Sequence, residues 1–436
     1  MAAFVSCFVI FVFPLFLLGT VTPGLVKATT DSLKDNARVV GRLGACDTIG
    51  SIIGTFAPTF LTIPAFGTSI SFLITSGVLL ALCLTYFISE FRTRRHLTAI
   101  IVSLLVFALC CATGWRSNFA FWERHLAYEG ESIYNYLQVR DTKDSTILST
   151  NVLFGVQSVT MKRPGLTGMY YDYALAAPAM AGVGERGTRA DRKPNLLVLG
   201  MGTGTYARQC ERFYPSMRTT GVEIDRKITD LSYRYFGASH AARTYTYDAR
   251  AFLAADRTPQ GRDRRYSVIM VDAYQDITIP FQMSSVEFFR LVRAHLKPGG
   301  VMVVNLNMRS GDKALRGRDI NTHLSDTIAT VFPHVYMVDV PDYTNRELFA
   351  TDSPDALERL ERVRDAQEGT DLGDLLDRID ASLVRYRSHH LPAMTDDKAP
   401  VELLGMREID SIIREQLRYY KNIFRTQGLQ GLLSAA

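Results

Sequence analysis

Four long apolar stretches with almost no charge occupy the first quarter of the chain, and they constrain its fold more than any other feature. They cover residues 4–26, 45–65, 69–89 and 97–115. An α-helix needs roughly 20 such residues to cross the hydrocarbon core of a membrane. The first stretch lacks a basic start, which favours a retained helix over a cleaved signal peptide. The sequence therefore predicts a transmembrane region with about four helices over residues 1–115.

The charges of the chain argue against nucleic acid as a partner. The formal net charge is +5 over 436 residues, and residues 1–115 contribute +3 of it. No segment gathers the clustered basic face that a nucleic-acid site needs. Five of the six cysteines lie before residue 115, and none has the spacing of a metal site or a disulfide framework. We expect a reducing compartment and no metal.

Beyond residue 115 the pattern changes to short strands. Residues 116–180 contain alternating segments that indicate a small β-hairpin region, namely Tyr134–Val139, Thr146–Leu148 and Val152–Thr160. Residues 181–194 are rich in glycine and charge, which is typical of a flexible linker.

From residue 195 onwards, buried strands alternate with helices. The predicted strands are Asn195–Gly200, Thr219–Ile224, Thr244–Tyr247, Ser267–Asp272 and Val301–Asn307. This alternation predicts an α/β fold with a parallel, doubly wound sheet over residues 195–352. Residues 353–436 carry charged amphipathic stretches, and we expect a C-terminal helical extension there.

Acidic residues and a glycine turn follow the predicted strands. Gly200, Gly202 and Gly204 follow the first strand, and the acids that end or follow the next three are Glu223, Asp248 and Asp272. Ligands of open parallel sheets bind beyond the carboxyl ends of the strands. Glycines let the backbone approach a ligand, and the next helix offers free N–H groups. Each position alone is more often a packing turn or a surface acid, but together they predict a nucleoside-binding site.

The acids fit particular parts of a nucleoside. Glu223 can accept both hydroxyls of a ribose, and Asp248 is placed to accept an adenine amino group. Asp272 has Tyr274 and Asp276 close behind it. Gly202–Ala207 also fits the G-x-G-x-x-A pattern, so a nicotinamide dinucleotide is a rival ligand.

Several motifs resemble those of the class I S-adenosylmethionine-dependent transferases, whose fold is Rossmann-like. They look more narrowly like the spermidine synthase (polyamine biosynthesis) domain. The motifs are Asn195–Leu199 with its glycine turn, Gly221–Asp225, Asp248–Arg250, Val268–Asp272, Glu131–Asn135, Phe154–Ser158 and Tyr170–Asp172. Phe281–Asn307, Thr395–Glu402 and the run from Gly41 to Thr68 resemble the membrane-fused bacterial branch of that family. The likeness covers nearly the whole chain.

The resemblance implies a donor site. Gly200, Gly202 and Gly204 would wrap the sulfonium side of the donor, Glu223 would hold its ribose and Asp248 its adenine. The donor would be decarboxylated S-adenosylmethionine or S-adenosylmethionine itself.

The resemblance also implies an acceptor site. Asn135 and Gln157 would touch the nucleoside or the amine, and Tyr170 and Tyr274 would contact the amine substrate. Asp272 or Asp276 would accept the proton. The reaction would be direct displacement by a polyamine or another small amine, without a metal. Because soluble relatives of this domain commonly pair, a homodimer is possible.

Three departures from the family pattern leave the reaction open. Thr203 stands where the family's G-G-G-D-G-G turn has its acid, so the intact donor becomes admissible. The second acid of D-S-S-D-P is displaced to Asp276, and Asn135 replaces a glutamine. An aminopropyltransferase is the first hypothesis. The alternatives are a methyltransferase acting on a small acceptor and a non-catalytic nucleoside-binding membrane sensor or scaffold.

The loop charges conflict with the expected location. Basic residues follow the first and third stretches, at Lys27, Lys34, Arg38 and Arg42 and at Arg92, Arg94 and Arg95. The positive-inside rule places both loops in the cytoplasm, which sends the chain after Trp115 to the outer side. A cytoplasmic donor requires the opposite. We expect a multi-pass protein of the inner cell membrane, in contact with lipid, with its transferase domain in the cytoplasm.

Overall fold

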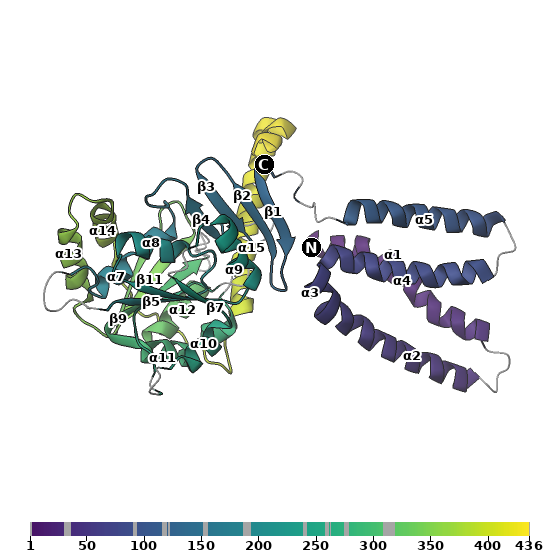
Figure 1. Ribbon diagram of the computed structural model, residues 1–436, viewed down its shortest axis with the longest axis horizontal. Coiled ribbons are helices and arrows are strands. Elements are labelled where there is room, and N and C mark those ends of the chain that lie inside the picture. The colour runs from purple at the N-terminus through teal and green to yellow at the C-terminus, as the bar shows by residue number, and fades with distance from the viewer. Residues whose placement is uncertain are drawn as a thin grey trace. The chain divides into compact units, whose positions relative to one another are not determined.

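The structure is a computed structural model of the chain. It describes residues 2–29, 36–89, 94–115, 120, 123–150, 156–185, 193–238, 242–257, 261, 263–273, 279–307 and 319–435. The chain forms two compact units, Met1–Phe119 and Ala120–Ala436 (Figure 1). The first unit holds the apolar helices, and the second holds two β-sheets with helices packed against them.

The first unit consists of long helices with mostly exposed apolar side chains. They are α1 (Ala2–Thr29), α2 (Asn36–Ala57), the π-helical turn η1 (Pro58–Thr62), α3 (Ile63–Phe66), α4 (Thr68–Ser89) and α5 (Arg94–Gly114). Four segments are long and apolar enough to cross a membrane: Val5–Thr29, Ala37–Phe66, Thr68–Thr85 and Leu97–Gly114. Their number agrees with the sequence prediction. The second begins at Ala37 rather than residue 45, because α2 continues through its glycines.

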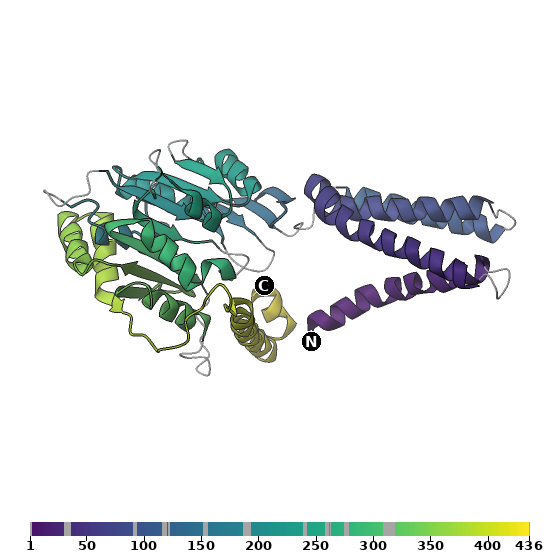
Figure 2. The ribbon, with the colours of Figure 1, turned by 90° about the horizontal axis from the view of Figure 1, so that it is seen from below.

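Helices α4 and α5 lie side by side (Figure 2). A β-carbon added at Gly77 of α4 would lie 3.2 Å from the ring of Phe107 on α5. At the other end of the pair, the Ser69 hydroxyl donates to the carbonyl of Gly114 at 2.7 Å. Small residues thus allow the two backbones to approach closely.

The second unit begins with a four-stranded antiparallel sheet. Its strands are β1 (Leu126–Glu131), β2 (Tyr136–Asp141), β3 (Ser145–Ser149) and β4 (Ser158–Met161), in spatial order. The inward side chains Leu137, Val139 and Leu148 pack against Ile228 and Leu231 of α9 (Arg226–Tyr235). The sequence predicted this small sheet without its first strand.

The larger sheet has eight strands in the order β12-β10-β11-β9-β8-β5-β6-β7. The parallel strands are β5 (Asn195–Leu199), β6 (Arg218–Glu223), β7 (Arg243–Thr246), β8 (Tyr266–Val271) and β9 (Leu296–Asn307). The antiparallel strands are β10 (His334–Asp339), β11 (Asn345–Thr351) and β12 (Val384–Arg385). The predicted doubly wound sheet is confirmed. The antiparallel edge was not predicted, and β9 begins five residues earlier than expected.

Helices cover both faces of this sheet (Figure 1). One face carries α6 (Tyr170–Tyr173), α7 (Ala176–Met180), α8 (Thr205–Phe213), α13 (Ala356–Ala366) and α14 (Asp371–Ser382). The other carries α10 (Ala249–Ala255), the short turn η2 (Phe281–Met283), α11 (Val286–Ala294), α12 (Ile320–Ala329) and the start of α15 (Val401–Ala435). Along β5, Leu196 and Val198 face the first layer, whereas Leu197 and Leu199 face the second, as strand alternation requires.

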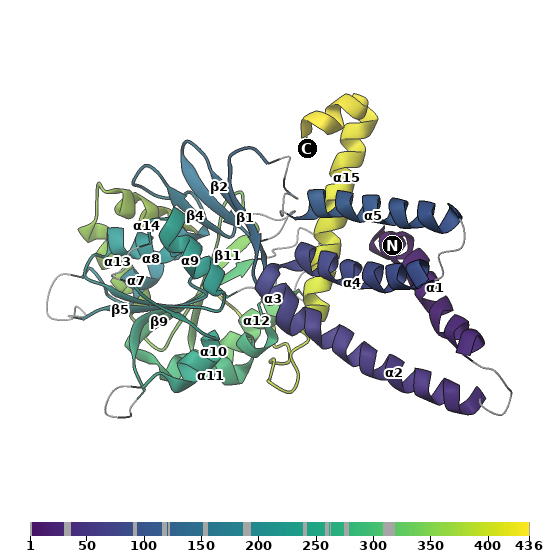
Figure 3. The ribbon, with the colours of Figure 1, turned by 45° about the vertical axis from the view of Figure 1, so that its right-hand side comes forward.

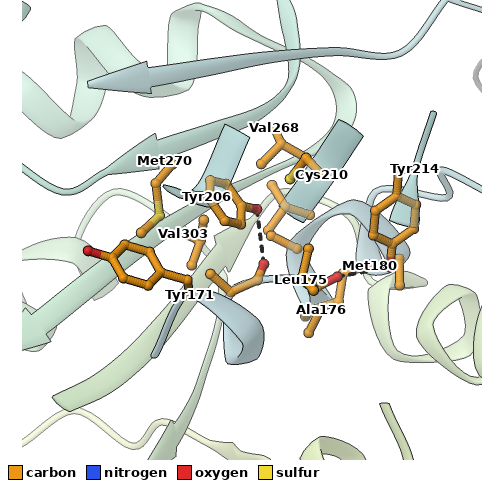
Figure 4. Close-up of a cluster of buried hydrophobic side chains, with 14 of the residues drawn as sticks. Tyr171, Leu175, Ala176, Met180, Tyr206, Cys210, Tyr214, Val268, Met270 and Val303 are labelled. Carbon is orange, nitrogen blue, oxygen red and sulfur yellow. Dashed lines mark hydrogen bonds between the residues drawn. The ribbon is translucent and has the colours of Figure 1, made fainter. Parts of the chain in front are cut away.

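Two tyrosines, Tyr206 in α8 and Tyr214 directly after it, hold α6 and α7 in place through hydrogen bonds (Figure 4). The Tyr206 hydroxyl donates to the carbonyl of Ala174 at 3.0 Å, and the Tyr214 hydroxyl donates to that of Leu175 at 2.9 Å. Both tyrosines are buried, so these bonds satisfy groups that water cannot reach. They hold α6 and α7 against the sheet, and α6 starts with Tyr170.

The turn after β5 offers a matched test of the glycine requirement. Gly200 and Gly204 both have left-handed φ angles, of +90° and +84°. A β-carbon at Gly200 would overlap the backbone of Asp272 and Ala273, whereas one at Gly204 would lie 3.4 Å from the Met201 methyl group. We expect Gly200→Ala to lower the thermal unfolding temperature clearly more than Gly204→Ala. The latter should cost only the roughly 1–2 kcal/mol of a left-handed alanine. Equal losses would contradict the packing argument.

Candidate active site

The carboxyl ends of β5, β6 and β8 and the start of α10 surround a cavity of about 310 Å³. Seven residues predicted from the sequence line it: Gly200, Gly202, Glu223, Asp248, Asp272, Asn135 and Gln157. Apolar side chains complete the wall, among them Met201, Ile228 and Met283. The cavity therefore combines a few polar groups with an apolar lining, as small-molecule sites usually do.

Glu223, the last residue of β6, shapes the glycine turn opposite it. One carboxylate oxygen accepts from the N–H of Gly202 at 2.8 Å, and the other accepts from the N–H of Asp225 at 3.0 Å. The side chain is 7% exposed, and burial raises its pKa to about 6. Two carboxylate oxygens can accept about four hydrogen bonds, so Glu223 can accept bonds from a ligand in addition to those from the two backbone N–H groups.

Asp248 caps α10 and faces the cavity. Its carboxylate accepts from the N–H of Ala251 at 2.7 Å. Two residues on, Arg250 donates to both carboxylate oxygens of Asp396 at 2.7 and 2.6 Å and to the carbonyl of Gln282 at 2.7 Å. This bidentate pair lowers the pKa of Asp396 to about 2, chiefly through the hydrogen bond from Arg250. It ties residues near the C-terminus to the cavity wall.

Asn135 reaches the cavity from the small sheet and is fixed by Asp225. Its amide nitrogen donates to Asp225 at 3.1 Å, and the Ser132 hydroxyl donates to the same oxygen at 2.5 Å. The other oxygen of Asp225 accepts from the N–H of Lys227 and so caps α9. Asp225 thus joins the small sheet to the strand that carries Glu223, although the sequence did not single it out as a site residue.

Asp272 directly follows β8, and two neutral donors hold it. The Tyr170 hydroxyl donates to one carboxylate oxygen at 2.8 Å, and the Asn305 amide donates to the other at 2.9 Å. The Asn305 carbonyl oxygen accepts in turn from Asn345 at 2.9 Å. Burial raises the pKa of Asp272 to about 7, while the two hydrogen bonds act in the opposite direction. Tyr170 does not itself line the cavity but contacts two residues that do, Asp272 through this bond and Tyr171 through its ring.

Glu347 is a buried acid next to this group, and sequence reasoning missed it. It lies on β11 directly opposite Asn305 of β9, with an exposed fraction of 0%. Neither carboxylate oxygen has a hydrogen-bond partner among the described residues. Burial holds its pKa well above the usual range, and the nearby charge of Asp272 adds to this effect. No strand was predicted there, so no sequence signal pointed to it.

Thr203 occupies the position at which the resembling family has an acid, but its side chain does not line the cavity. The residue is fully buried, its N–H donates to Ser158, and its carbonyl accepts from Arg208 at 2.7 Å. Gly204 also lies away from the cavity, at the start of α8.

Two predicted residues, Tyr274 and Asp276, lie outside the described residues. Among those described, no group of three or more His, Cys, Asp and Glu side chains could hold a metal ion. Asn305 was missed as a site residue, although a polar residue inside a predicted buried strand was an available signal.

A Rossmann-like sheet with acids at the ends of β6 and β8 and at the start of α10 defines a nucleoside-binding protein. The family model of the spermine/spermidine synthase domain matches residues 180–354. A probable polyamine aminopropyl transferase of Bifidobacterium longum is 51% identical over 368 residues, 81% of this chain and 78% of the relative. The chain therefore belongs to the spermine/spermidine synthase family. The predicted family and enzyme class are confirmed.

More distant proteins are similar as well. A polyamine aminopropyltransferase of Vibrio vulnificus is 27% identical over 243 residues, 55% of this chain and 75% of the relative. The solved structure of a probable spermidine synthase from Corynebacterium glutamicum is 21% identical, with a TM-score of 0.44, and the match covers 61% of this chain and 96% of that chain.

Glu347 gives a stability prediction with a defined pH dependence. Because its folded pKa is raised, the folded state keeps a proton that the unfolded state releases above about pH 4.3. Stability is therefore lost as the pH rises. We expect Glu347→Gln to raise the unfolding temperature of the detergent-solubilised chain, more at pH 8 than at pH 5. The exposed Glu361→Gln is the control, and a gain that does not depend on pH would contradict the assignment.

Proposed function

We propose that this chain is a polyamine aminopropyltransferase that uses decarboxylated S-adenosylmethionine as donor. The observation that carries the proposal is the half-buried carboxylate of Asp272 in a cavity that Glu223 and Asp248 also line. The relative with 51% identity is itself named a probable polyamine aminopropyl transferase, which supports the same reaction.

The reaction is a displacement at a carbon bonded to a positive sulfur. The amine nitrogen of the acceptor forms a C–N bond as the C–S bond breaks, and the sulfur keeps the electron pair and becomes a neutral thioether. Because the donor is already activated, the protein mainly aligns the reactants, which contributes roughly 7–11 kcal/mol. Gly200 and Gly202 would bind beside the sulfur, Glu223 at the ribose and Asp248 at the adenine.

The acceptor must lose a proton, and we propose Asp272 as the base that takes it. An alkyl ammonium has a pKa near 10.4, so the acceptor is charged at neutral pH and is attracted to a carboxylate. A base with a pKa of about 7 is well matched to work at neutral pH. The hydrogen bonds from Tyr170 and Asn305 orient the carboxylate of Asp272 and favour its ionised form. Asn135 and Gln157 would contact the substrates from the small sheet, and Tyr274 would do so from beyond β8.

Replacing Asp272 tests the base. We expect Asp272→Asn to abolish aminopropyl transfer to a diamine while donor binding stays near that of the unchanged chain. In the unchanged chain kcat/KM should rise with pH to about 7 and then level off, because only the ionised carboxylate accepts a proton. Asn305→Ala removes a donor to that carboxylate and should move the rise to higher pH. The matched control is Asn345→Ala, which removes the hydrogen bond from Asn345 to Asn305 and leaves the bond from Asn305 to Asp272 in place. Retained turnover in Asp272→Asn would move the base to Asp276.

A methyltransferase is the second candidate, and Thr203 favours it. An acid at this position would pair with the amine of the decarboxylated donor and repel the carboxylate of the intact one. Thr203 is neutral and buried, so it provides no such selection. Donor preference then depends on the other groups around the cavity, Asp272 among them.

Calorimetry with three adenosine-containing ligands separates the candidate functions. We expect decarboxylated S-adenosylmethionine to bind more tightly than the intact molecule and NAD. Glu223→Ala should weaken this binding by roughly 10–100-fold, as expected for a lost hydrogen bond to a charged group. Asp230→Ala on the exposed side of α9 is the control. Tighter binding of the intact donor would favour methyl transfer, and unchanged affinity in Glu223→Ala would contradict the site.

The location of the enzyme is part of the proposal. The four apolar helices would anchor the chain in the inner cell membrane, with lipid around them, and the transferase unit would face the cytoplasm, where its donor is made. The basic loops after the first and third helices argue for the other side. Pairing of two chains stays a prediction.

A further inference from the structure

Helix α15 is attached to the second unit only by its first turns. Val401 and Leu404 are 1% and 6% exposed and pack in the same core cluster as α12. Glu408 is 1% exposed as well. The following turns run out from the sheet (Figure 3). The segment from Ser411 to Gln427 would be roughly 25 Å long as a helix, and the helical geometry breaks at Gly428.

An apolar stripe begins at Met406, in the docked start of α15, and continues along its projecting part. Met406, Ile413, Leu417 and Phe424 are 57%, 42%, 62% and 51% exposed. They are spaced by seven, four and seven residues, which places them on one side of a helix. Soluble proteins rarely leave such a contiguous stripe uncovered.

A row of basic residues runs beside this stripe. Each member follows an apolar position by one residue, which turns it about 100° around the helix. The exposed members are Arg407, Arg414, Arg418, Lys421 and Arg425. Arg414 lies 3.8 Å from Asp410. Beyond Asp410 the helix contains four basic residues and one acid, whereas its docked start contains three acids and one basic residue.

We propose that the projecting part of α15 lies on the surface of a membrane that contains anionic lipid. An apolar stripe beside a row of Lys and Arg is the pattern of a helix that lies in the membrane interface. The apolar side chains would enter the boundary of the acyl chains, and the basic row would contact lipid phosphates. The inference rests on the proposed membrane location, because the four candidate spans keep a bilayer within reach of this helix.

The charges favour lipid over a second copy of the chain as the occupant. Two projecting α15 helices packed antiparallel along their stripes would bring their basic rows to the same side of the pair, and like charges repel. The acids that could compensate lie mostly in the docked start, where Glu408 is already buried. Anionic headgroups complement the row without such repulsion.

Hydrogen exchange of the full chain in lipid nanodiscs tests the proposal. The discs would contain phosphatidylcholine alone or phosphatidylcholine with phosphatidylglycerol. We expect amides of residues 411–427 to exchange roughly tenfold more slowly in the anionic discs at low salt, and the difference to shrink at high salt. Arg418→Glu with Lys421→Glu should remove the difference. The matched control is Arg290→Glu with Arg387→Glu, which makes the same charge change at exposed sites elsewhere in the unit.

The outcomes separate this proposal from the others. Equal exchange in both kinds of disc would overturn it. Protection that follows the number of chains per disc, whatever the lipid, would assign the stripe to a second copy.

If the chain stays soluble without detergent, the membrane spans are wrong, and sedimentation with anionic liposomes tests the helix instead. Loss of sedimentation in Arg418→Glu with Lys421→Glu would then support it, and no sedimentation of the unchanged chain would refute it. Aminopropyl transfer should be the same in all variants.

Discussion

The desolvation of one half-buried carboxylate, Asp272, is the constraint on which the rest of the site depends. A charged group in a poorly hydrated position is costly unless donors compensate it. Here Tyr170 and Asn305 do so by donating to different oxygens of the carboxylate. Their positions depend on the tyrosines that hold α6 and on the pairing of β9 with β11. The core behind the cavity therefore sets the geometry and the pKa of this carboxylate.

A second network fixes the rim of the same cavity. Arg250 joins α10, the turn that contains Gln282 and the C-terminal segment around Asp396, and Ser285 donates to that carboxylate as well. Because Asp248 is two residues before Arg250, the part of the cavity wall that Asp248 forms is tied to the segment that leads into α15. The motif Thr395–Glu402, which resembles the family, does not line the cavity, but its Asp396 holds the cavity wall through Arg250.

The sequence predicted the parts of the site that depend on strand ends, because parallel strands bring their carboxyl ends to one edge. Glu223, Asp248 and Asp272 were placed in this way. It could not predict Asp225, Asn305 or Glu347 as site residues, since their roles arise from the pairing of strands and from contacts between sheets. The antiparallel strands β10 and β11 were missed for a related reason. Residues of β11 pair with β9, which lies about 40 positions earlier in the chain, and β10 pairs in turn with β11. No glycine turn or strand–helix alternation marks either strand.

The two units require different surroundings, and α15 combines both patterns in one helix. Within its described part, unit 1 exposes nearly all its large apolar side chains, which an apolar solvent can accommodate. Unit 2 buries its own between sheet and helices. The start of α15 follows the second pattern, with buried Val401 and Leu404, and the part beyond Asp410 follows the first, with basic residues added. A helix that served only as a solvated extension would need neither the apolar stripe nor the change in charge, whereas a helix that runs from a soluble core to a lipid surface needs both.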